Sequence, residues 1–552
     1  MAPIFVGSTD DDSRIRGNRV GFAISTANPG TASEGDIYFN STDKQLRGYD
    51  GSAWAAIGGG GGGTSEFTVS GTLSDGQTVI LKSDGNVAGV TTTQITQTTG
   101  FTTTTYHSGN TSDFDIAWDA SNQKVVIAYR DQVDGDKGKA IVGTISGTSI
   151  SFGSAVTFDS GRAEYISIVY DSTNERVVIG YIDNSSQNHG RAIVGTVSGT
   201  SINFGSVTDF SNDNANEDIA CKYISGIHNS TDNKIVFAFQ ETTDNDRGKA
   251  IVATVDPSDN SISFGDRATF ETGITFPIQA VYDSNVNKTV IVYGDSSDSQ
   301  RGKASVGTIS GTDISFGSEW TFETGNTYHI GAAFDSENNK VVIAYKDAGD
   351  SSYGKVKIGT VSGTMVTYGT EVIFSTQNTN DSNVIYDPIA KKVVILFRDN
   401  SDQNTGKYQV GTVVGTGITF EYQQNNDNLP AFNAATGGGY LPHGVFASTE
   451  NVIPFIFRNQ SNNYYQEASV FRNAYVATNL EANNFLGFSD AAYTNGQSAT
   501  IQMVGAVDDA QTGLTTATRL FVQTDGSLST TADTPSVLGG TAISATKIIV
   551  RK

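Results

Sequence analysis

The chain has 552 residues, of which 61 are glycine, and its 35 basic and 58 acidic residues give a formal net charge of −23. Because affinity for a phosphate backbone or an anionic bilayer grows with each Lys or Arg, this charge argues against nucleic acid and membrane surfaces as partners. The composition is rich in Gly, Thr, Ser, Asn and Val, with few of the runs that helices favour, so we predict an all-β protein.

Cysteine usage and the start of the chain limit the cellular setting. The single cysteine, Cys221, cannot form an internal disulfide, and we expect its side chain to be a small buried hydrophobe. The chain starts without the basic head and apolar core of a secretory signal, and no later run is long enough to span a bilayer. We therefore expect a protein that is made in a cytoplasm and is not inserted in a membrane.

The first predicted module covers residues 1–57. Within it, 35–54 read GDIYFNSTDKQLRGYDGSAW, which are two short aromatic strands around an NSTD turn. Six consecutive glycines at 58–63 follow, and because glycine has almost no conformational preference they are typical of a joint. We predict a β-hairpin module at 1–57 and a Gly-rich linker and connector at 58–90.

Residues 91–475 repeat one pattern. A Gly followed by Lys or Arg recurs every 52 to 58 residues, and an Asp or Asn that ends an apolar run keeps the same register. The glycines are Gly138, Gly190, Gly248, Gly302, Gly354 and Gly406, and the polar residues are Asp119, Asp171, Asn229, Asp283, Asp335 and Asp387. Two landmarks that keep register over six units indicate a repeat architecture.

Each unit contains four short segments of strand length, bounded by Gly, Asn, Asp or Ser. In the second repeat these segments are 165–171, 176–183, 191–199 and 201–206. Four antiparallel strands in about 52 residues is the size of a propeller blade, and a ring of blades leaves only short, protected edges.

A seventh, degenerate repeat at 445–473 lacks a convincing fourth strand. A Thr-rich segment at 92–105 precedes the first repeat and belongs to no blade of its own. Both features are explained if the amino-terminal segment pairs as the missing strand of the last blade and so closes the ring. The predicted fold is therefore all-β: a seven-bladed β-propeller of four-stranded antiparallel blades over 91–475, with small β-modules at both ends. Six and eight blades are the alternatives.

The connections between the predicted strands are unequal in length. Strands two and three are joined by eight-residue polar loops, namely DQVDGDKG, DNSSQNHG, ETTDNDRG, DSSDSQRG, DAGDSSYG and DNSDQNTG, whereas the other hairpins use short turns. In an up-and-down blade the long loops and the links between blades fall on one face. We predict that this face is a broad polar surface for display.

The tail, 480–552, is predicted to be a small β-domain, and three segments of the chain resemble parts of bacteriophage proteins. Segment 35–54 resembles the hairpin module near the ends of many tail-fibre proteins. Segment 70–90, SGTLSDGQTVILKSDGNVAGV, resembles a connector of marine phage fibres. Segment 495–552, with GLT at 513–515 and GTAISAT at 540–546, is similar to a domain that ends many phage fibre and capsid-associated proteins.

These resemblances imply a marine or cyanophage-like tail-fibre or fibre-like virion structural protein with a β-propeller. In such proteins the amino terminus commonly docks on other virion proteins and the distal part meets the host. Trimers are frequent in the group, so a homotrimer is implied, although a bulky closed propeller departs from the usual slender shaft. The implied location is the virion, after synthesis in the host cytoplasm.

Charged side chains at the loop ends of the strands are the candidate ligand-binding residues. The triplets YRD, YKD and FRD could clamp a sugar between an aromatic face and a charged fork, or seal each blade against the next, which we favour. The three Asp of DQVDGDKG could hold Ca²⁺, or bond their own loop backbone, which we also favour. The candidates are Arg130, Asp131, Asp134, Asp136, Asp183, Asp295, Lys346, Asp347, Arg398 and Asp399; metal is left open and no cofactor is expected.

An enzyme is not expected. The five histidines, His107, His189, His228, His329 and His443, occur singly, and no S-x-D-x-G-x-T-W box of the sialidase type is present. Acidic residues are too numerous for any pair to stand out as the two carboxylates of glycoside hydrolysis.

We expect a virion structural protein of the tail-fibre or receptor-binding type, which attaches to a host-surface glycan or outer-membrane protein. One alternative is a capsid-associated fibre or decoration protein. The alternative from another class is a propeller glycan hydrolase or lyase that acts as a depolymerase.

Overall fold

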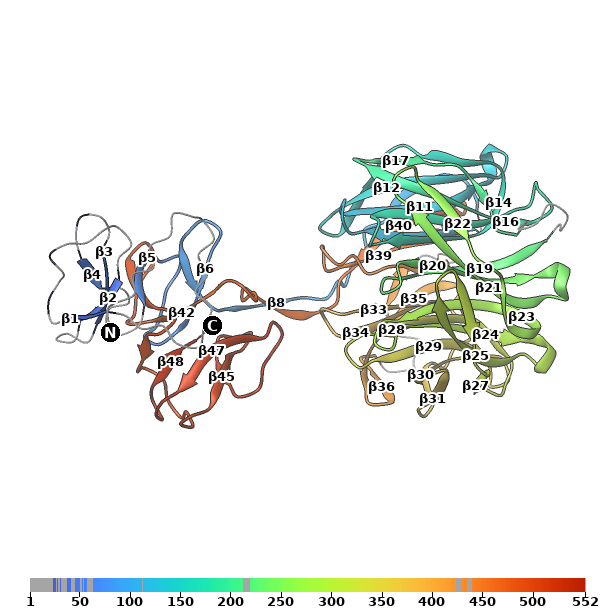
Figure 1. The fold of residues 1–552 in the computed structure, drawn as a ribbon. Coiled ribbons are helices and arrows are strands. Elements are labelled where there is room, and N and C mark those ends of the chain that lie inside the picture. The colour runs from blue at the N-terminus through green and yellow to red at the C-terminus, as the bar shows by residue number, and fades with distance from the viewer. Residues whose placement is uncertain are drawn as a thin grey trace. The chain divides into compact units, whose positions relative to one another are not determined.

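The structure, a computed structural model, describes residues 63–111, 113–211, 219–422, 429–433 and 439–551, together with 23–25, 27, 30, 37–40, 45–49, 52 and 54–56. These residues form strands, four short 3-10 segments and no α-helix, so the all-β prediction is confirmed. Within them, no helix has both the length and the apolar character needed to cross a membrane. The chain divides into two compact units, Met1–Ile95 with Val476–Lys552, and Thr96–Tyr475 (Figure 1).

The second unit is built from seven antiparallel sheets. In the first sheet, β10 (Phe114–Asp119), β11 (Lys124–Asp131) and β12 (Lys137–Ser146) pair in order. The outer edge of β12 is covered by two pieces, because β13 (Ser149–Phe152) pairs with its second half and the start of β14 (Val156–Asp171) pairs with its first half. The predicted fourth strand is therefore present as β13, and the start of β14 is a further strand on this edge that the sequence did not predict.

The next five sheets repeat this order. Sheet two contains the rest of β14, β15 (Arg176–Asp183), β16 (His189–Ser198), β17 (Ser201–Phe204) and β18 (Thr208–Asp209); sheet three contains β19 (Cys221–Asn229), β20 (Lys234–Glu241), β21 (Arg247–Asp256), β22 (Ser261–Phe264) and the start of β23 (Ala268–Asp283). Sheet four contains the rest of β23, β24 (Lys288–Asp295), β25 (Arg301–Ser310), β26 (Asp313–Phe316) and β27 (Trp320–Glu323). Sheet five contains β28 (Thr327–Asp335), β29 (Lys340–Asp347), β30 (Tyr353–Ser362), β31 (Met365–Tyr368) and β32 (Val372–Ser375); sheet six contains β33 (Thr379–Asp387), β34 (Lys392–Asp399), β35 (Thr405–Val414), β36 (Gly417–Phe420) and β37 (Ala431–Asn433).

The seventh sheet takes its outer strand from the amino-terminal end of the unit. β38 (Tyr440–Gly444), β39 (Ile453–Asn459) and β40 (Tyr465–Phe471) pair in order, and β40 also pairs with β9 (Thr104–His107). An amino-terminal strand therefore completes the last sheet, as the sequence predicts. The first part of the predicted segment differs, because β8 (Thr92–Ile95) pairs with β41 (Tyr475–Thr478) instead.

The first strands of the seven sheets contact one another in an order that returns to its start: β10, β14, β19, β23, β28, β33, β38 and β10 again. Side chains accept hydrogen bonds from the next strand along this order. Asp115 accepts from the N–H of Ile168, Ser167 from Gly226, Ser225 from Ala280 and Asn383 from Gly444, each at 3.0 Å, and His443 Nδ1 lies 3.2 Å from Asp115. These bonds satisfy polar groups between sheets and fix the register of neighbouring sheets.

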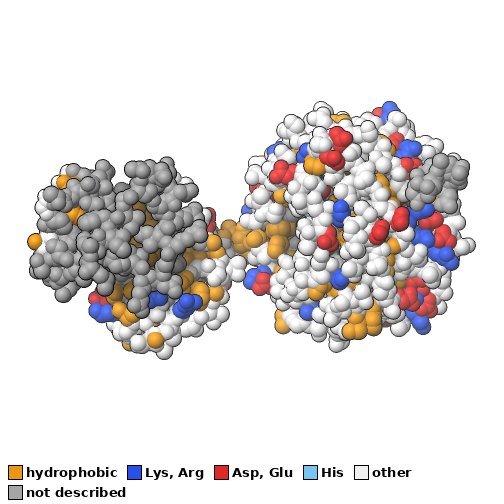
Figure 2. All heavy atoms as spheres, in the orientation of Figure 1, with side chains coloured by type: hydrophobic (Ala, Val, Ile, Leu, Met, Phe, Trp, Pro, Cys, Tyr) orange, Lys and Arg blue, Asp and Glu red, His pale blue; other side chains and the backbone are white. Residues whose placement is uncertain are grey.

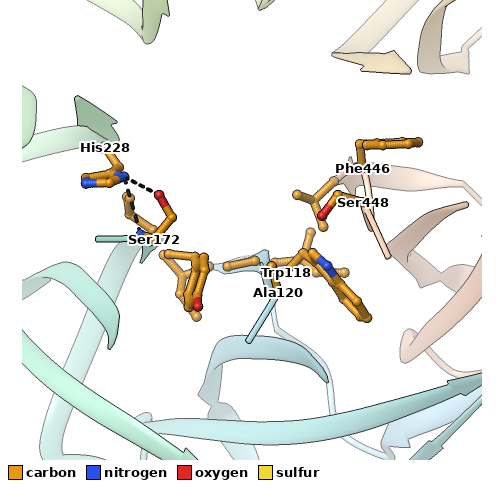
Figure 3. Close-up of a pocket in the computed structure, with 13 residues that line it drawn as sticks. Trp118, Ala120, Ser172, His228, Phe446 and Ser448 are labelled. Atoms are coloured by element: carbon orange, nitrogen blue, oxygen red, sulfur yellow. Dashed lines mark hydrogen bonds between the residues drawn. The ribbon is translucent and has the colours of Figure 1, made fainter. Parts of the chain in front are cut away.

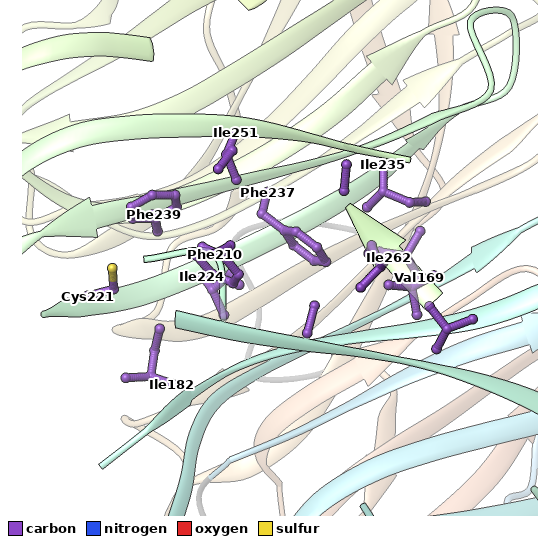
Figure 4. Close-up of a cluster of buried hydrophobic side chains, with 14 of the residues drawn as sticks. Val169, Ile182, Phe210, Cys221, Ile224, Ile235, Phe237, Phe239, Ile251 and Ile262 are labelled. Carbon is purple, nitrogen blue, oxygen red and sulfur yellow. The ribbon is translucent and has the colours of Figure 1, made fainter. Parts of the chain in front are cut away.

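Apolar side chains fill the spaces between neighbouring sheets. One cluster joins sheets two and three, and in it the rings of Phe210 and Phe237 stack with centroids 5.8 Å apart (Figure 4). Cys221 is fully buried in this cluster, which confirms the prediction for the cysteine. Burial raises the pKa of its thiol well above the usual range.

Among the described residues, the first unit contains three sheets besides the two-stranded pair of β8 and β41. In one of them, β1 (Ala23–Ser25) pairs parallel with β2 (Ile37–Asn40), which pairs antiparallel with β3 (Gln45–Tyr49), and β4 (Trp54–Ala56) follows. The β2–β3 pair lies where the sequence predicts a hairpin. Residues 41–43 of the predicted turn at 40–43, and 58–62 of the predicted joint at 58–63, lie outside the described residues.

The expectation of a linker and connector over 58–90 differs from the structure. β5 (Thr64–Thr68), β6 (Thr78–Leu81) and β7 (Val87–Gly89) form one sheet with β42 (Phe485–Ser489) and β43 (Ser498–Gln502) of the tail. Their apolar residues are buried in clusters shared with the tail, so the segment is part of a compact unit. The third sheet contains β44 (Val507–Asp508), β45 (Arg519–Val522), β46 (Leu528–Ser529), β47 (Val537–Ala542) and β48 (Ile548–Val550).

Candidate functional site

The long loops between second and third strands begin with a recurring capping carboxylate. Asp131 Oδ1 accepts from the backbone N–H groups of Val133 and Asp134 at 3.0 and 3.1 Å. Asp295, Asp347 and Asp399 each accept two loop N–H groups in the same way, and Asp183 accepts one. Asp favours this position because its short side chain satisfies backbone donors in a tight turn.

The second oxygen of each capping carboxylate holds the cation that follows the repeated Gly. The Nζ to Oδ2 distances are 2.8 Å for Lys139–Asp131, 2.7 Å for Lys303–Asp295 and Lys355–Asp347, and 2.9 Å for Lys407–Asp399, while Arg191 pairs with Asp183. All five carboxylates are buried. The contacts of these five candidates are therefore those of groups that stabilise their own loops. They are Asp131, Asp183, Asp295, Asp347 and Asp399.

Protein cations also surround the other acids of the predicted calcium loop. Lys137 and Lys139 lie 2.9 and 2.8 Å from Asp134, and chiefly the hydrogen bond from Lys139 lowers the pKa of Asp134 to about 2. Asp136 lies 3.7 Å from Arg130 Nε. Among the described residues one group of three carboxylates has metal-like spacing, namely Glu271, Asp295 and Glu319, and the Lys303 ammonium pairs with two of them.

A different row of charged residues lies one position before the capping residues. In the seven second strands this row holds Arg130, Ile182, Gln240, Gly294, Lys346, Arg398 and Arg458. The four basic residues belong to sheets five, six, seven and one, which are consecutive in the closed order of first strands. We call Lys346, Arg398, Arg458 and Arg130 the basic arc.

The first strands carry a β-bulge at the same end. In five sheets the pairing register shifts there, and one residue has a positive φ of 48° to 55°: Tyr165, Tyr223, His329, Asp381 and Leu441. Bulges re-aim side chains, and here they bring aromatic rings of neighbouring sheets together. The ring centroids of Tyr165 and Tyr223 are 4.8 Å apart, and those of Tyr223 and Phe276 are 4.3 Å apart.

In sheet six the bulge residue is Asp381, whose carboxylate meets the basic arc. Arg398 Nε lies 2.8 Å from Oδ2, His329 Nδ1 lies 3.2 Å from Oδ1, and the Leu441 N–H donates to Oδ2 at 3.3 Å. Burial alone would raise the pKa of Asp381, but His329 and Arg398 hold it below its usual range.

Tyr440 of sheet seven lies between two guanidinium groups of the basic arc, and Tyr464 lies beyond the second of them. The guanidinium carbon of Arg398 lies 4.2 Å from the ring centroid of Tyr440, and that of Arg458 lies 4.9 Å from the same ring. Arg458 also lies 5.3 Å from the ring centroid of Tyr464. Cations and rings therefore alternate, an arrangement in which each ring face attracts the neighbouring charge.

A pocket of about 420 Å³ lies at the opposite end of the first strands. Its wall includes Ile116, Trp118, Val169 and Phe446, with Ser172 and His228 among its polar residues (Figure 3). Trp118 pairs with the start of β11, whereas Arg130 lies near the end of that strand, so the pocket and the basic arc are separated by the length of the sheet. Sequence reasoning missed this pocket because four different sheets build it.

The structure places the predicted candidates Lys346 and Arg398, which belong to neighbouring sheets, close enough for the charge of Arg398 to lower the pKa of Lys346. Arg130 is held separately by Asp113 and Glu164, at 2.8 and 2.9 Å. Sequence reasoning missed Arg458, although the FRN triplet at 457–459 occupies the place of YKD in sheet five and could have revealed it.

No protein-family model matches the chain, and no curated protein matches it. Among solved structures, AofleA from Arthrobotrys oligospora has a TM-score of 0.37 at 11% identity, over 63% of this chain and 95% of that one. A protein of unknown function from Dyadobacter fermentans has a TM-score of 0.40 at 9% identity, over 69% and 98% of the two chains. The intramolecular trans-sialidase of Ruminococcus gnavus has a TM-score of 0.40 at 11% identity, over 67% and 97%. Likenesses this weak do not assign a function to this chain.

Proposed function

We propose that the seven sheets are the blades of a seven-bladed β-propeller, and that the loop end binds a host surface. The observation that carries this proposal is the loop pattern. The capping position is buried in every long loop, while the next four positions are exposed or half-buried and differ: QVDG, NSSQ, TTDN, SSDS, AGDS and NSDQ. A constant frame with variable tips suits recognition, since the frame fixes where each tip is presented.

The protein is, on this proposal, a virion structural component of the tail-fibre or receptor-binding type. Support comes from the resemblance of 35–54, 70–90 and 495–552 to parts of phage fibre proteins. The amino-terminal module then docks on other virion proteins, and the partner of the loop end is a host glycan or outer-membrane protein. Figure 2 shows acidic and basic side chains interspersed over the visible face of the second unit, without the basic field that nucleic acid binding requires.

A glycan depolymerase has less support. Burial raises the pKa of Glu271, and a hydrogen bond with it lowers that of Glu319, as a catalytic acid and its partner require. Their nearest oxygens, however, lie within 4.8 Å, and Tyr293 and Lys303 already bond to them. Glycosidase carboxyls are roughly 5 to 9.5 Å apart and face the substrate. We therefore propose binding without hydrolysis.

The test is binding of the full chain to an array of bacterial capsular and O-antigen polysaccharides and to intact bacterial cells, with an assay for new reducing ends. We expect saturable binding and no new reducing ends. A matched variant replaces QVDG at 132–135 by NSSQ of the sister loop, and we expect an unchanged Tm with an altered binding profile. New reducing ends would favour the depolymerase, and no binding to any polysaccharide or cell contradicts the proposal.

A further inference from the structure

We propose that Lys346, Arg398 and Arg458, with Tyr440 and Tyr464, form a binding site for an anionic sugar, whose carboxylate or sulfate group they bind. This inference rests on the proposed binding function and names the ligand class of one part of the loop end. It starts from the charge balance in this part of the protein.

Most of the cations that follow the repeated Gly are neutralised by more than one acid. Lys303 and Lys355 each lie within 3.2 Å of three carboxylates, and Lys139 and Lys407 each lie within 3.0 Å of two. Burying a charge is costly unless it is paired, so this pairing is the expected arrangement.

Lys346 and Arg458 depart from this arrangement. Among the described residues, no carboxylate lies within 4.0 Å of either cation. Lys346 donates instead to the amide oxygens of Asn378 and Asn380, both at 2.8 Å, and Arg458 donates to the amide oxygen of Asn110 at 3.4 Å. Both cations are half-buried, and burial lowers the pKa of each.

One carboxylate, which is bonded to Arg398, influences both cations through its charge without contacting them. That carboxylate is Asp381, which is already bonded to Arg398, His329 and the Leu441 N–H. Three cations therefore face one anion, in a chain whose overall charge is −23. An incoming anion would supply the missing charge, and it would gain charge-assisted hydrogen bonds from donors that already have fixed positions.

The tyrosines supply aromatic rings, which can pack against a sugar while the cations bind its anionic group. Tyr440 lies between the Arg398 and Arg458 guanidinium groups, and Tyr464 lies beyond Arg458. All four side chains are half-buried, so each also has an accessible part. The ring stack fixes the guanidinium groups, and an aromatic face can pack against the apolar face of a sugar ring. One donor is still open, because the buried Arg458 Nε has no hydrogen-bond partner among the described residues.

An anionic sugar fits these features better than a nucleic acid does. The cations form a cluster of three in a strongly acidic protein, and a phosphate backbone would meet repulsion on either side of so small a cluster. A polysaccharide that carries one anion per sugar or per disaccharide needs only this local positive charge.

The experiment measures binding of the full chain to three polymers: alginate as a polyuronate, dextran sulfate as a sulfated polymer and dextran as a neutral control. We expect binding to alginate or dextran sulfate that weakens as salt rises, and none to dextran. Which acidic polymer binds distinguishes a carboxylate from a sulfate ligand.

Variants assign the binding to the site. Arg458→Gln and Lys346→Gln should each weaken binding at least tenfold and reduce its salt dependence, while Arg458→Lys should keep the salt dependence and lose affinity because the planar stack is gone. The matched control is Lys391→Gln, an exposed lysine at the opposite end of sheet six that pairs with Glu337, and it should bind as the wild type does.

Two results would overturn the inference. One is binding to acidic polymers that Lys391→Gln weakens as much as Arg458→Gln does, in variants whose Tm values match the wild type. The other is binding of the wild type to neutral polysaccharides or to cells, but to neither acidic polymer. In that second case the proposed attachment function still stands, whereas the absence of all binding refutes both.

Discussion

At the scale of single residues, the loop frame depends on a buried ion pair that is also hydrogen-bonded. In sheet six the Lys407 side chain is 2% exposed and that of Asp399 is 0% exposed, and their charged atoms lie 2.9 Å apart. Asp399 also accepts two N–H groups of its loop, so its charge is both paired and bonded. Such a group is stable only while all of its partners remain.

Replacing Lys407 by Met should therefore destabilise the second unit. Breaking a buried pair from one side leaves an uncompensated charge and typically costs roughly 3–5 kcal/mol. The control is Lys137→Met, which removes an exposed partner of Asp134 and should cost less than about 1 kcal/mol. Urea unfolding gives both values, and equal costs for the two variants would refute the structural role of the buried pair.

The titration of Tyr129 makes the stability of the fold depend on pH in the alkaline range. Burial, with a smaller contribution from the charge of Asp131, raises the pKa of Tyr129 from 10.0 to about 12. In that interval the folded chain keeps a proton that the unfolded chain loses, so the stability that Tyr129 contributes is present below about pH 10 and is lost as the pH rises towards about 12. The phenolate absorbance of the wild type minus that of Tyr129→Phe should rise with a midpoint near pH 12 in the folded protein and near pH 10 in denaturant. A folded-state midpoint near 10 would contradict the burial of this ring.

At the scale of elements, neighbouring sheets approach closely where the fourth strand of one ends beside a turn of the next. A Cβ atom on Gly265, which follows β22, would lie 1.9 Å from the backbone oxygen of Thr312 in the next sheet. The same approach recurs at Gly153 and Gly369, with distances of 2.0 and 1.9 Å to the corresponding backbone oxygens. The Gly that ends each SFG-type segment is therefore needed for sheet packing.

Gly265→Ala should lower the stability of the second unit by roughly 1–3 kcal/mol, because a methyl group forced into a packed interface displaces the backbone it meets. Gly417→Ala is the control, since its Cβ would meet one atom at 3.8 Å, an ordinary contact. Thermal unfolding followed by circular dichroism compares the two variants. A Tm for Gly265→Ala equal to that of Gly417→Ala would show that the sheets are less closely packed than the structure has them.

At the scale of the whole molecule, the sequence predicts the repeats better than their details. Apolar alternation and turn residues mark the strands, and the spare Thr-rich segment points to the strand that completes the last sheet, because these signals are local or repeat in register. The sequence predicts a fourth strand that ends at the Gly-Ser pair of SISFGS, because this pair is typical of a turn, and it does not predict the further strand that follows. The sequence predicts a connector rather than strands at 64–89, because the partners of β5 and β6 lie more than 400 residues away in the tail.

In the candidate site, too, the sequence predicts the features that depend on neighbouring residues and misses those that depend on contacts between sheets. The capping role of Asp131 and its equivalents follows from a local turn, so the sequence indicates it. The stack of Arg398, Tyr440 and Arg458 joins strands from two sheets, and its geometry depends on the bulge that places Leu441 at positive φ, a conformation that sequence propensity disfavours for this residue. Sequence reasoning therefore found single charges and missed the group.

The closed order of seven sheets is the claim on which the rest depends, and a cross-link tests it most directly. Thr104 of β9 and Ala468 of β40 are register partners, and the Cα spacing of antiparallel partners suits a disulfide. We expect Thr104→Cys combined with Ala468→Cys to form an intramolecular disulfide on oxidation, read by mass spectrometry and non-reducing electrophoresis, with each single variant as a control and Cys221 still reduced. Free thiols after oxidation, or disulfides found only between chains, would contradict the closed order.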